Sequence, residues 1–327
     1  MTELTESQFL AILPEILRQH QLTPTEQKLP FSAWHLTPQT KIVMPCDQLR
    51  DGRKVPVRLK IRVPNSVTSR ETFIAFEQAA REVNEQLFKA GLPAQRTIEA
   101  NFDQPPEWII REEIEGSPIG NRSFDPAVSD EEIMAFLERL RTSLDQIAPR
   151  VNRQLLSTYN WQTKWLDQFN EAGSNILAHL GEKTFELVKE KLSQPITTQL
   201  TNSLVHTDLS PINILRGQAG LFPIDWNEAL WGPRAIDWMT IWSFAYDRPD
   251  LSELILTAML KEPHDPNERQ ETIKVAEATA ARMLYKFAES YDYHLKSPGE
   301  RKGNIEEAIQ ALPLATSRFT TLLQRLG

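Results

Sequence analysis

The order of apolar and polar positions divides the chain into a strand-rich first part and a helical second part. Apolar side chains at helical spacing predict a helix over residues 5–20. Residues 55–63 instead alternate, with Arg58, Lys60 and Arg62 on the face opposite the valines and leucine, which is typical of a β-strand. The same signals predict one helix at residues 69–90 and further strands at 31–36, 41–49, 95–101 and 107–114.

Beyond residue 115 the apolar spacing is helical over most of the chain. Ser129 and Glu132 have the spacing of a capping box that opens a helix running to about residue 147. Further helices are predicted at residues 160–180, 182–193, 236–246, 250–261, 268–292 and 304–325. We therefore expect an α+β protein with two domains, residues 1–115 and 116–327, the first of which includes the N-terminal helix.

Composition excludes several classes of protein. Only 12 of the 327 residues are glycine, and none has the spacing of a dinucleotide-binding fingerprint or a P-loop. The single cysteine, Cys46, excludes an internal disulfide and a cysteine-based zinc site. The six histidines are scattered without an H-E-x-x-H pair, and the net charge of −8 makes a nucleic-acid partner a poor expectation.

Membrane association is not expected either. The first residues lack the basic and apolar regions of a signal peptide. No apolar run reaches the roughly 18 residues of a membrane span. A single cysteine also fits a reducing compartment, so the sequence predicts a cytoplasmic protein.

The most informative stretch lies between residues 204 and 242. It contains His206-x-Asp208, four more residues and Asn213, then a turn and Asp225 after a short apolar segment. This is the order of a kinase catalytic loop, in which a carboxylate orients and accepts the proton of the attacking hydroxyl. Asp208 fits this role of general base. His206 is expected to brace the loop.

A kinase also needs magnesium to neutralise charge on the nucleotide phosphates. This hard cation prefers oxygen ligands. Asn213 supplies an amide oxygen and Asp225 a carboxylate, so we expect these two residues to be the metal ligands.

The segments HTDLSPINIL and IDWNEALWGPRAID resemble the aminoglycoside phosphotransferase and choline kinase superfamily, a branch of the protein-kinase-like fold. The resemblance implies a bilobal protein with a small antiparallel-sheet N-lobe carrying one helix, and a larger, mainly helical C-lobe. It implies the same roles for Asp208, Asn213 and Asp225, and a structural role for Asp237 near the catalytic loop.

The resemblance also implies a nucleotide-binding set in the N-lobe. Lys60 matches the strand lysine that holds the nucleotide phosphates. Glu82, with Glu85 in reserve, matches the helix glutamate that pairs with this lysine. The adenine-binding hinge falls at Glu112–Ile114, with Glu112 and Ile114 as its ends.

The phosphate-covering loop and the base pocket depart from the pattern. The loop from Thr37 to Thr40 has no glycine, although threonine hydroxyls and backbone amides remain for phosphate. Arg58 and Arg111 replace apolar residues near the base, and a buried arginine must be paired. The sequence offers Glu112, Glu113 and Glu115 as partners, and the hypothesis is a polar pocket that favours GTP or has lost nucleotide binding.

The sequence therefore predicts a magnesium-dependent kinase for small molecules. It would move the γ-phosphoryl group of ATP or GTP to a hydroxyl of an antibiotic, amino-alcohol or sugar-like acceptor, and Trp231 is a possible acceptor contact. The main alternative is a catalytically silent kinase-fold protein that binds a ligand or partner. A protein kinase ranks lower, because no long activation segment separates Asp225 from Asp237.

Overall fold

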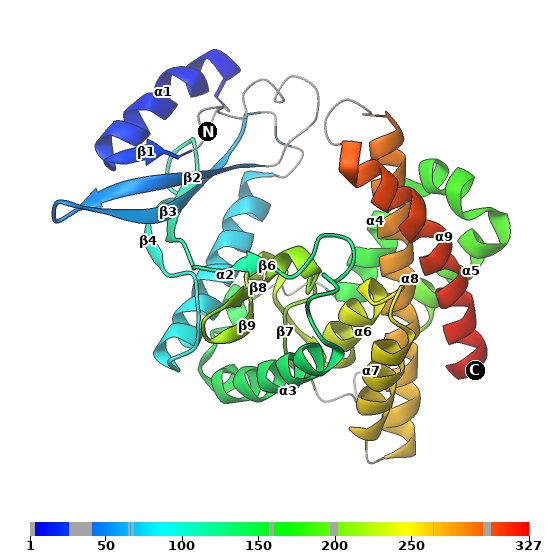
Figure 1. The fold of residues 1–327 in the computed structure, drawn as a ribbon. Coiled ribbons are helices and arrows are strands. Elements are labelled where there is room, and N and C mark those ends of the chain that lie inside the picture. Colours follow the sequence, from blue (N-terminus) through cyan, green and yellow to red (C-terminus); the bar gives the residue numbers. More distant parts are fainter. Residues whose placement is uncertain are drawn as a thin grey trace. The chain divides into compact units, whose positions relative to one another are not determined.

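The structure, a computed structural model, describes residues 4–25, 41–64, 66, 69–156, 160–196, 202–263, 265–296 and 302–326. The chain forms two compact units. Unit 1 comprises Met1–Glu115 and Arg150–Leu156, and unit 2 comprises Gly116–Pro149 and Ser157–Gly327. An antiparallel sheet dominates the first unit and helices the second, which confirms the predicted α+β class (Figure 1).

Unit 1 is built on a five-stranded antiparallel sheet in the order β1-β2-β3-β5-β4. Its elements are α1 (Glu6–Gln19), β1 (Leu22–Pro24), β2 (Lys41–Arg50), β3 (Arg53–Arg62), α2 (Arg70–Lys89), β4 (Thr97–Asn101) and β5 (Trp108–Glu112). The strand expected at residues 31–36 lies outside the described residues. The three-residue β1 was not predicted, because so short a segment carries no periodic signal.

The alternation along β3 decides what each face of this sheet contacts. Its apolar face joins one core cluster with α1, β2 and β5, which includes Phe9, Leu13, Met44, Leu59, Ile61 and Ile110. The opposite face carries Arg58, Lys60 and Arg62. Lys60 and Arg62 are nevertheless buried, at 5% and 7% exposure, so this face is covered as well.

Unit 2 is mainly helical. Its helices are α3 (Asp130–Ile147), α4 (Trp161–Leu180), α5 (Glu182–Ser193), α6 (Ala235–Phe244), α7 (Pro249–Lys261), α8 (Pro266–Lys296) and α9 (Lys302–Leu326). These seven match the predicted helices, with ends that differ by a few residues. No helix in the described part of the chain combines the length and apolar character needed to cross a membrane.

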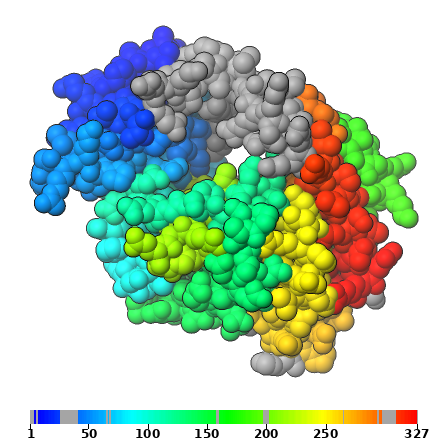
Figure 2. Space-filling model, viewed as in Figure 1, coloured from blue at the N-terminus to red at the C-terminus, as the bar shows by residue number. Residues whose placement is uncertain are grey.

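Two small sheets interrupt the helices of unit 2. Strands β7 (Asn202–Val205) and β10 (Leu230–Pro233) pair with each other, while β8 (Ile214–Gly217) lies between β6 (Ser117–Pro118) and β9 (Gly220–Pro223). The β8–β9 hairpin, yellow-green in Figure 2, lies on the surface beside α3. These strands frame the segments that the sequence marks as catalytic.

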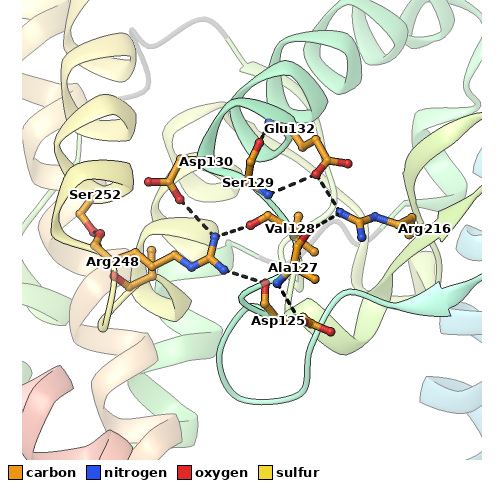
Figure 3. Close-up of polar contacts among 10 residues, drawn as sticks. Asp125, Ala127, Val128, Ser129, Asp130, Glu132, Arg216, Arg248 and Ser252 are labelled. Atoms are coloured by element: carbon orange, nitrogen blue, oxygen red, sulfur yellow. Dashed lines mark hydrogen bonds and ion pairs between the residues drawn. The ribbon is translucent and has the colours of Figure 1, made fainter.

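Ionic contacts fix the start of α3 to the rest of unit 2 (Figure 3). The predicted capping box is present: Ser129 Oγ accepts from the Glu132 amide and the Glu132 carboxylate accepts from the Ser129 amide. Arg216 on β8 donates to the same Glu132 carboxylate at 2.7 Å. Arg248, at the start of α7, donates to the Val128 carbonyl oxygen at 2.6 Å and to the Asp130 carboxylate at 3.1 Å.

Candidate active site

Residues 206–213, the 206–213 loop, connect β7 to β8 in unit 2. The Asp237 carboxylate, in the first turn of α6, fixes the start of this loop. Both carboxylate oxygens lie 3.0 Å from the His206 amide nitrogen and accept its hydrogen bond. Oδ1 also accepts a hydrogen bond from the Thr207 amide at 2.9 Å. Asp237 is only 6% exposed, so these two amides depend on its carboxylate, and not on bulk water, for their hydrogen bonds.

His206 holds the loop to the segment that contains Asp225. Its Nε2 lies 2.8 Å from the Ile224 carbonyl oxygen, and its Nδ1 lies 3.3 Å from the Asp208 amide nitrogen. A carbonyl can only accept and an amide N–H can only donate, so this geometry assigns the donor role to Nε2 and the acceptor role to Nδ1. Its ring also packs on Trp226, with centroids 4.4 Å apart. These contacts support the bracing role expected for His206.

Thr207 adopts a left-handed conformation with φ of +68°. Such a φ is a genuine outlier for a β-branched residue. Its neighbours stabilise the conformation at every polar atom: Thr207 Oγ1 donates to the Glu228 carbonyl oxygen at 3.1 Å, and Arg282 Nη1 donates to the Thr207 carbonyl oxygen at 2.9 Å. The residue before Asp208 is therefore held by contacts from three elements.

Asp208 and Asn213 contact each other across the loop. Asn213 Nδ2 donates to the Asp208 carboxylate at 2.8 Å and to the Asp208 carbonyl oxygen at 3.1 Å. Burial raises the pKa of the Asp208 carboxyl, and the negative charge of Glu228 raises it further. The sequence predicted Asp208 as a base, and this environment suits a proton acceptor.

The β8–β9 register brings Asn213 and Asp225 to one end of the hairpin. Ile214 pairs with Pro223, and the Ile224 amide donates to the Asn213 carbonyl oxygen at 2.8 Å. Asp225 follows with φ of +63°, a left-handed conformation that aspartate tolerates better than most residues. Two residues twelve apart in the sequence thus become neighbours through the hairpin.

The donors of Asn213 and Asp225 fit magnesium. Magnesium commonly uses one or two protein oxygens and completes its shell with water and substrate phosphates. Among the described residues, no three histidine, cysteine, aspartate or glutamate side chains are grouped to hold a metal by themselves.

Two cations beside the 206–213 loop were missed by the sequence analysis. Arg282 of α8 is 4% exposed, donates to the Thr207 carbonyl oxygen and to Glu228 Oε2, and lies 4.7 Å over the Trp165 ring. Lys164 of α4 has its Nζ 3.8 Å from the same Glu228 oxygen. Neither belongs to a motif, and only the long apolar stretch around Arg282 hinted at a buried arginine.

In unit 1, Lys60 lies on β3 opposite Ile109 of β5 and is buried. The predicted partner Glu82 lies elsewhere: its carboxylate accepts the Asn152 amide at 2.9 Å and the Gln86 side chain at 3.2 Å. Within the described residues it makes no ion pair with Lys60. The buried glutamate of α2 is Glu77, five residues earlier, because the helix turns that side chain toward the sheet.

Glu77 pairs with Arg111 of β5. Arg111 Nη2 lies 2.6 Å from Glu77 Oε2, and both side chains have 0% exposure. Arg58, opposite Arg111 on β3, forms a two-point pair with Glu113 at 2.6 Å for each contact. The arginines are paired as burial requires, but the partner of Arg111 is none of the three glutamates that the sequence offered.

The predicted hinge follows β5 directly. The Glu112 amide donates to the Arg96 carbonyl oxygen at 2.9 Å, and the Glu113 amide to the Pro56 carbonyl oxygen at 3.1 Å. In the described part of the chain, the Ile114 amide makes no backbone hydrogen bond. Thr37 and Thr40 lie outside the described residues.

Comparisons with solved structures show which proteins share the fold of this chain. The chain resembles an aminoglycoside phosphotransferase in ternary complex with ADP and hygromycin B, with a TM-score of 0.55, 12% identity and coverage of 97% of this chain and 99% of that chain. It resembles a spectinomycin phosphotransferase in complex with ADP and spectinomycin, with a TM-score of 0.57, 11% identity and coverage of 96% and 98%. A choline kinase from Cryptosporidium parvum gives a TM-score of 0.53, 12% identity and coverage of 96% and 94%.

At such low identity, these TM-scores show a shared fold and nothing more. No curated protein sequence matches the chain. The sequence profile described as the phosphotransferase enzyme family matches residues 49–269, which is more than half of the chain and includes Lys60, Asp208, Asn213 and Asp225. The chain therefore belongs to the phosphotransferase enzyme family.

Proposed function

We propose that the protein transfers the γ-phosphoryl group of ATP or GTP to a hydroxyl of a small molecule. The observation that carries this proposal is the Asp208–Asn213 contact, in a loop whose amides Asp237 fixes. A pre-positioned carboxylate of raised pKa beside a magnesium-type oxygen pair is the minimum that phosphoryl transfer requires.

Asp208 is the proposed general base. Its carboxylate accepts the proton of the acceptor hydroxyl while the hydroxyl oxygen bonds to the γ-phosphorus. The bond from the γ-phosphorus to the bridging oxygen breaks, and the nucleoside diphosphate leaves with that electron pair. Because its pKa is raised, Asp208 holds the proton more readily than an exposed aspartate would.

Asn213 and Asp225 are the proposed magnesium ligands, and Lys60 is the proposed partner of the nucleotide phosphates. Magnesium, when bound, neutralises negative charge on the transferred phosphoryl group. The resemblance to kinases implies a helix glutamate that pairs with this lysine. We propose Glu77 for this role, because it is the buried carboxylate of α2.

We further propose that the backbone of Glu112–Ile114 binds the base. The Ile114 amide is the available donor, since the Glu112 and Glu113 amides are already bonded. Arg58 and Arg111 each carry a glutamate partner, so they add no uncompensated charge to unit 1. Thermal shift with magnesium and either ATP or GTP measures the donor preference.

The decisive test is Asp208→Asn. This change removes the base and keeps the side-chain size, so turnover measured by ADP or GDP release should fall by about 10²–10⁴-fold. Binding of a non-hydrolysable nucleotide with magnesium should persist. Asp167→Asn on the exposed surface of α4 is the matched control and should retain full activity.

Undiminished turnover in Asp208→Asn would refute the mechanism. Absence of both magnesium-dependent nucleotide binding and hydrolysis in the unmodified protein would support the alternative, a catalytically silent kinase-fold protein.

A further inference from the structure

We propose that Arg282 of α8 is a positioning residue for the general base, because it holds the peptide group through which the chain enters Asp208. This inference rests on the proposed function and deepens it by adding a residue of a distant helix to the site. All the residues involved belong to unit 2.

The peptide group between Thr207 and Asp208 is hydrogen-bonded at both of its polar atoms. Arg282 Nη1 donates to the Thr207 carbonyl oxygen at 2.9 Å, and the Asp208 amide donates to His206 Nδ1 at 3.3 Å. Because a peptide group is planar, a rotation of this group would break both hydrogen bonds. The two contacts together restrict the direction in which the backbone enters Asp208.

The conformation of Thr207 makes such a restraint necessary. Its φ of +68° lies in the left-handed region, which costs energy for a β-branched residue. A residue keeps such a conformation only where the contacts around it over-determine it. Thr207 is 1% exposed, so bulk water cannot replace Arg282 at its carbonyl oxygen. Loss of Arg282 would therefore favour an ordinary conformation of Thr207, which turns the peptide group that follows.

Asn213 holds the other side of Asp208. Its Nδ2 donates to the Asp208 carboxylate at 2.8 Å and to the Asp208 carbonyl oxygen at 3.1 Å. Among the hydrogen bonds of residues 206–208 in the described part of the chain, only that of Arg282 comes from outside residues 206–237. Arg282 thus links the start of the 206–213 loop to the long helix α8.

Arg282 is itself held in one place. Its Nη2 lies 3.3 Å from Glu228 Oε2, and its guanidinium carbon lies 4.7 Å from the centre of the Trp165 ring. Trp165 belongs to α4, which packs against α8 (Figure 1). The Glu228 carbonyl oxygen in turn accepts from Thr207 Oγ1 at 3.1 Å. Arg282, Glu228 and Thr207 therefore form a closed ring of contacts, and Arg282 is only 4% exposed within it.

The contact with Thr207, and not the charge of Arg282 alone, is the part of this ring that reaches Asp208. Glu228 Oε2 also lies 3.8 Å from Lys164 Nζ, so Glu228 keeps a cation if Arg282 is removed. The Thr207 carbonyl oxygen and Glu228 contact two different nitrogen atoms of one planar guanidinium. A lysine, with a single nitrogen, does not reproduce this arrangement.

The first experiment measures the loop without nucleotide or acceptor. Hydrogen–deuterium exchange is followed for the peptide that contains residues 206–213, whose first two amides donate to Asp237. We expect Arg282→Met to speed the exchange of this peptide by about 10–10²-fold, the effect of losing a hydrogen bond from a charged group. Arg282→Lys retains one donor and should give a smaller increase, and it carries the comparison if Arg282→Met fails to fold.

Lys191→Met is the matched control. Lys191 Nζ of α5 lies 3.0 Å from Glu277 Oε2 of α8, with side chains 15% and 6% exposed. The variant breaks another largely buried ion pair of the same helix, so it should lower the melting temperature and leave the exchange of residues 206–213 unchanged. Equal exchange of this peptide in the unmodified protein, in the Arg282 variants and in Lys191→Met would overturn the proposal.

The second experiment separates positioning from a loss of stability. ADP release from ATP is measured with magnesium, with water as the acceptor. We expect Arg282→Met to lower kcat by about 10²-fold and to leave the KM for ATP within about twofold. In the Asp208→Asn variant, adding Arg282→Met should lower the residual rate by less than about twofold, because no base remains to be positioned. An unchanged kcat in Arg282→Met, or a full additional loss in Asp208→Asn, would contradict the inference.

The two experiments also distinguish this inference from the proposed function. Undiminished ADP release in Asp208→Asn, or none in the unmodified protein, counts against the proposed function. The exchange comparison remains readable in either case, because it depends only on the contacts between Arg282 and the 206–213 loop, and it then decides whether Arg282 holds the peptide group.

Discussion

Asp237 offers the sharpest test of how the fold builds the site. Its carboxylate accepts the His206 and Thr207 amides, with distances of 2.9–3.0 Å. Asp237→Ala removes both acceptors and leaves two amides in a place where the aspartate itself is only 6% exposed.

The magnitude follows from those two amides. Each buried donor left without a partner costs about 1–3 kcal/mol, so the loss is about 2–6 kcal/mol. A whole domain is stable by only about 5–15 kcal/mol, so Asp237→Ala is expected to lose the 206–213 loop or the fold of unit 2. Asp237→Asn keeps Oδ1, which serves both amides, and should cost about 1.5–3 kcal/mol for the lost charge-assisted contact.

The assay combines chemical denaturation with turnover. Asp237→Asn should lower the melting temperature by about 2–4 °C for each kcal/mol lost, and turnover should fall because Asp208 is no longer held rigidly. Thr240→Val is the control: Thr240 is buried on the same helix, and its hydroxyl bonds only within α6, to the Ile236 carbonyl oxygen. If Asp237→Ala has unchanged stability and turnover, the view that Asp237 holds the loop is wrong.

Two further predictions concern unit 1. Arg111→Met removes the guanidinium group that pairs with the buried Glu77 carboxylate, and it should lower the free energy of unfolding by about 3–5 kcal/mol. Arg58→Met removes the half-exposed pair with Glu113 and should lower the free energy of unfolding by only about 0–1 kcal/mol. Equal losses in denaturant titrations would contradict this difference. Burial raises the pKa of the Cys46 thiol to about 11, so alkylation by iodoacetamide at pH 7 should be slow in the folded protein. The rate of alkylation should increase as the pH rises toward that value, and alkylation should become fast when the protein unfolds. Rapid labelling of the native protein at pH 7 would count against the buried thiol.

Local patterns in the sequence were enough for most of the architecture. The alternation of residues 55–63 predicted β3, and the Ser129–Glu132 spacing predicted the first turn of α3. The spacing of His206, Asp208 and Asn213 marked these residues as members of one loop, and the structure shows the contacts among them. Short-range patterns of this kind follow from backbone geometry, which neighbouring residues largely determine.

The partners of the buried charges could not be obtained in this way. Glu77 and Glu82 lie on the same helix, and only the rotation of α2 against the sheet decides that Glu77 reaches Arg111 while Glu82 reaches Asn152. The assignment of Arg150–Leu156 to unit 1 also depends on contacts between distant segments, so no local sequence pattern indicates it.

The sequence by itself determined which residues form the 206–213 loop, and the tertiary structure decided what holds and surrounds it. Threonine at position 207 is visible in the sequence, but its left-handed conformation and its contacts with Glu228 and Arg282 are not. Arg282 lies 75 residues from Thr207, and the apolar residues around it do not indicate which backbone atoms it contacts. Which distant side chains meet depends on how helices pack, and that packing placed Lys164 and Arg282 beside Glu228.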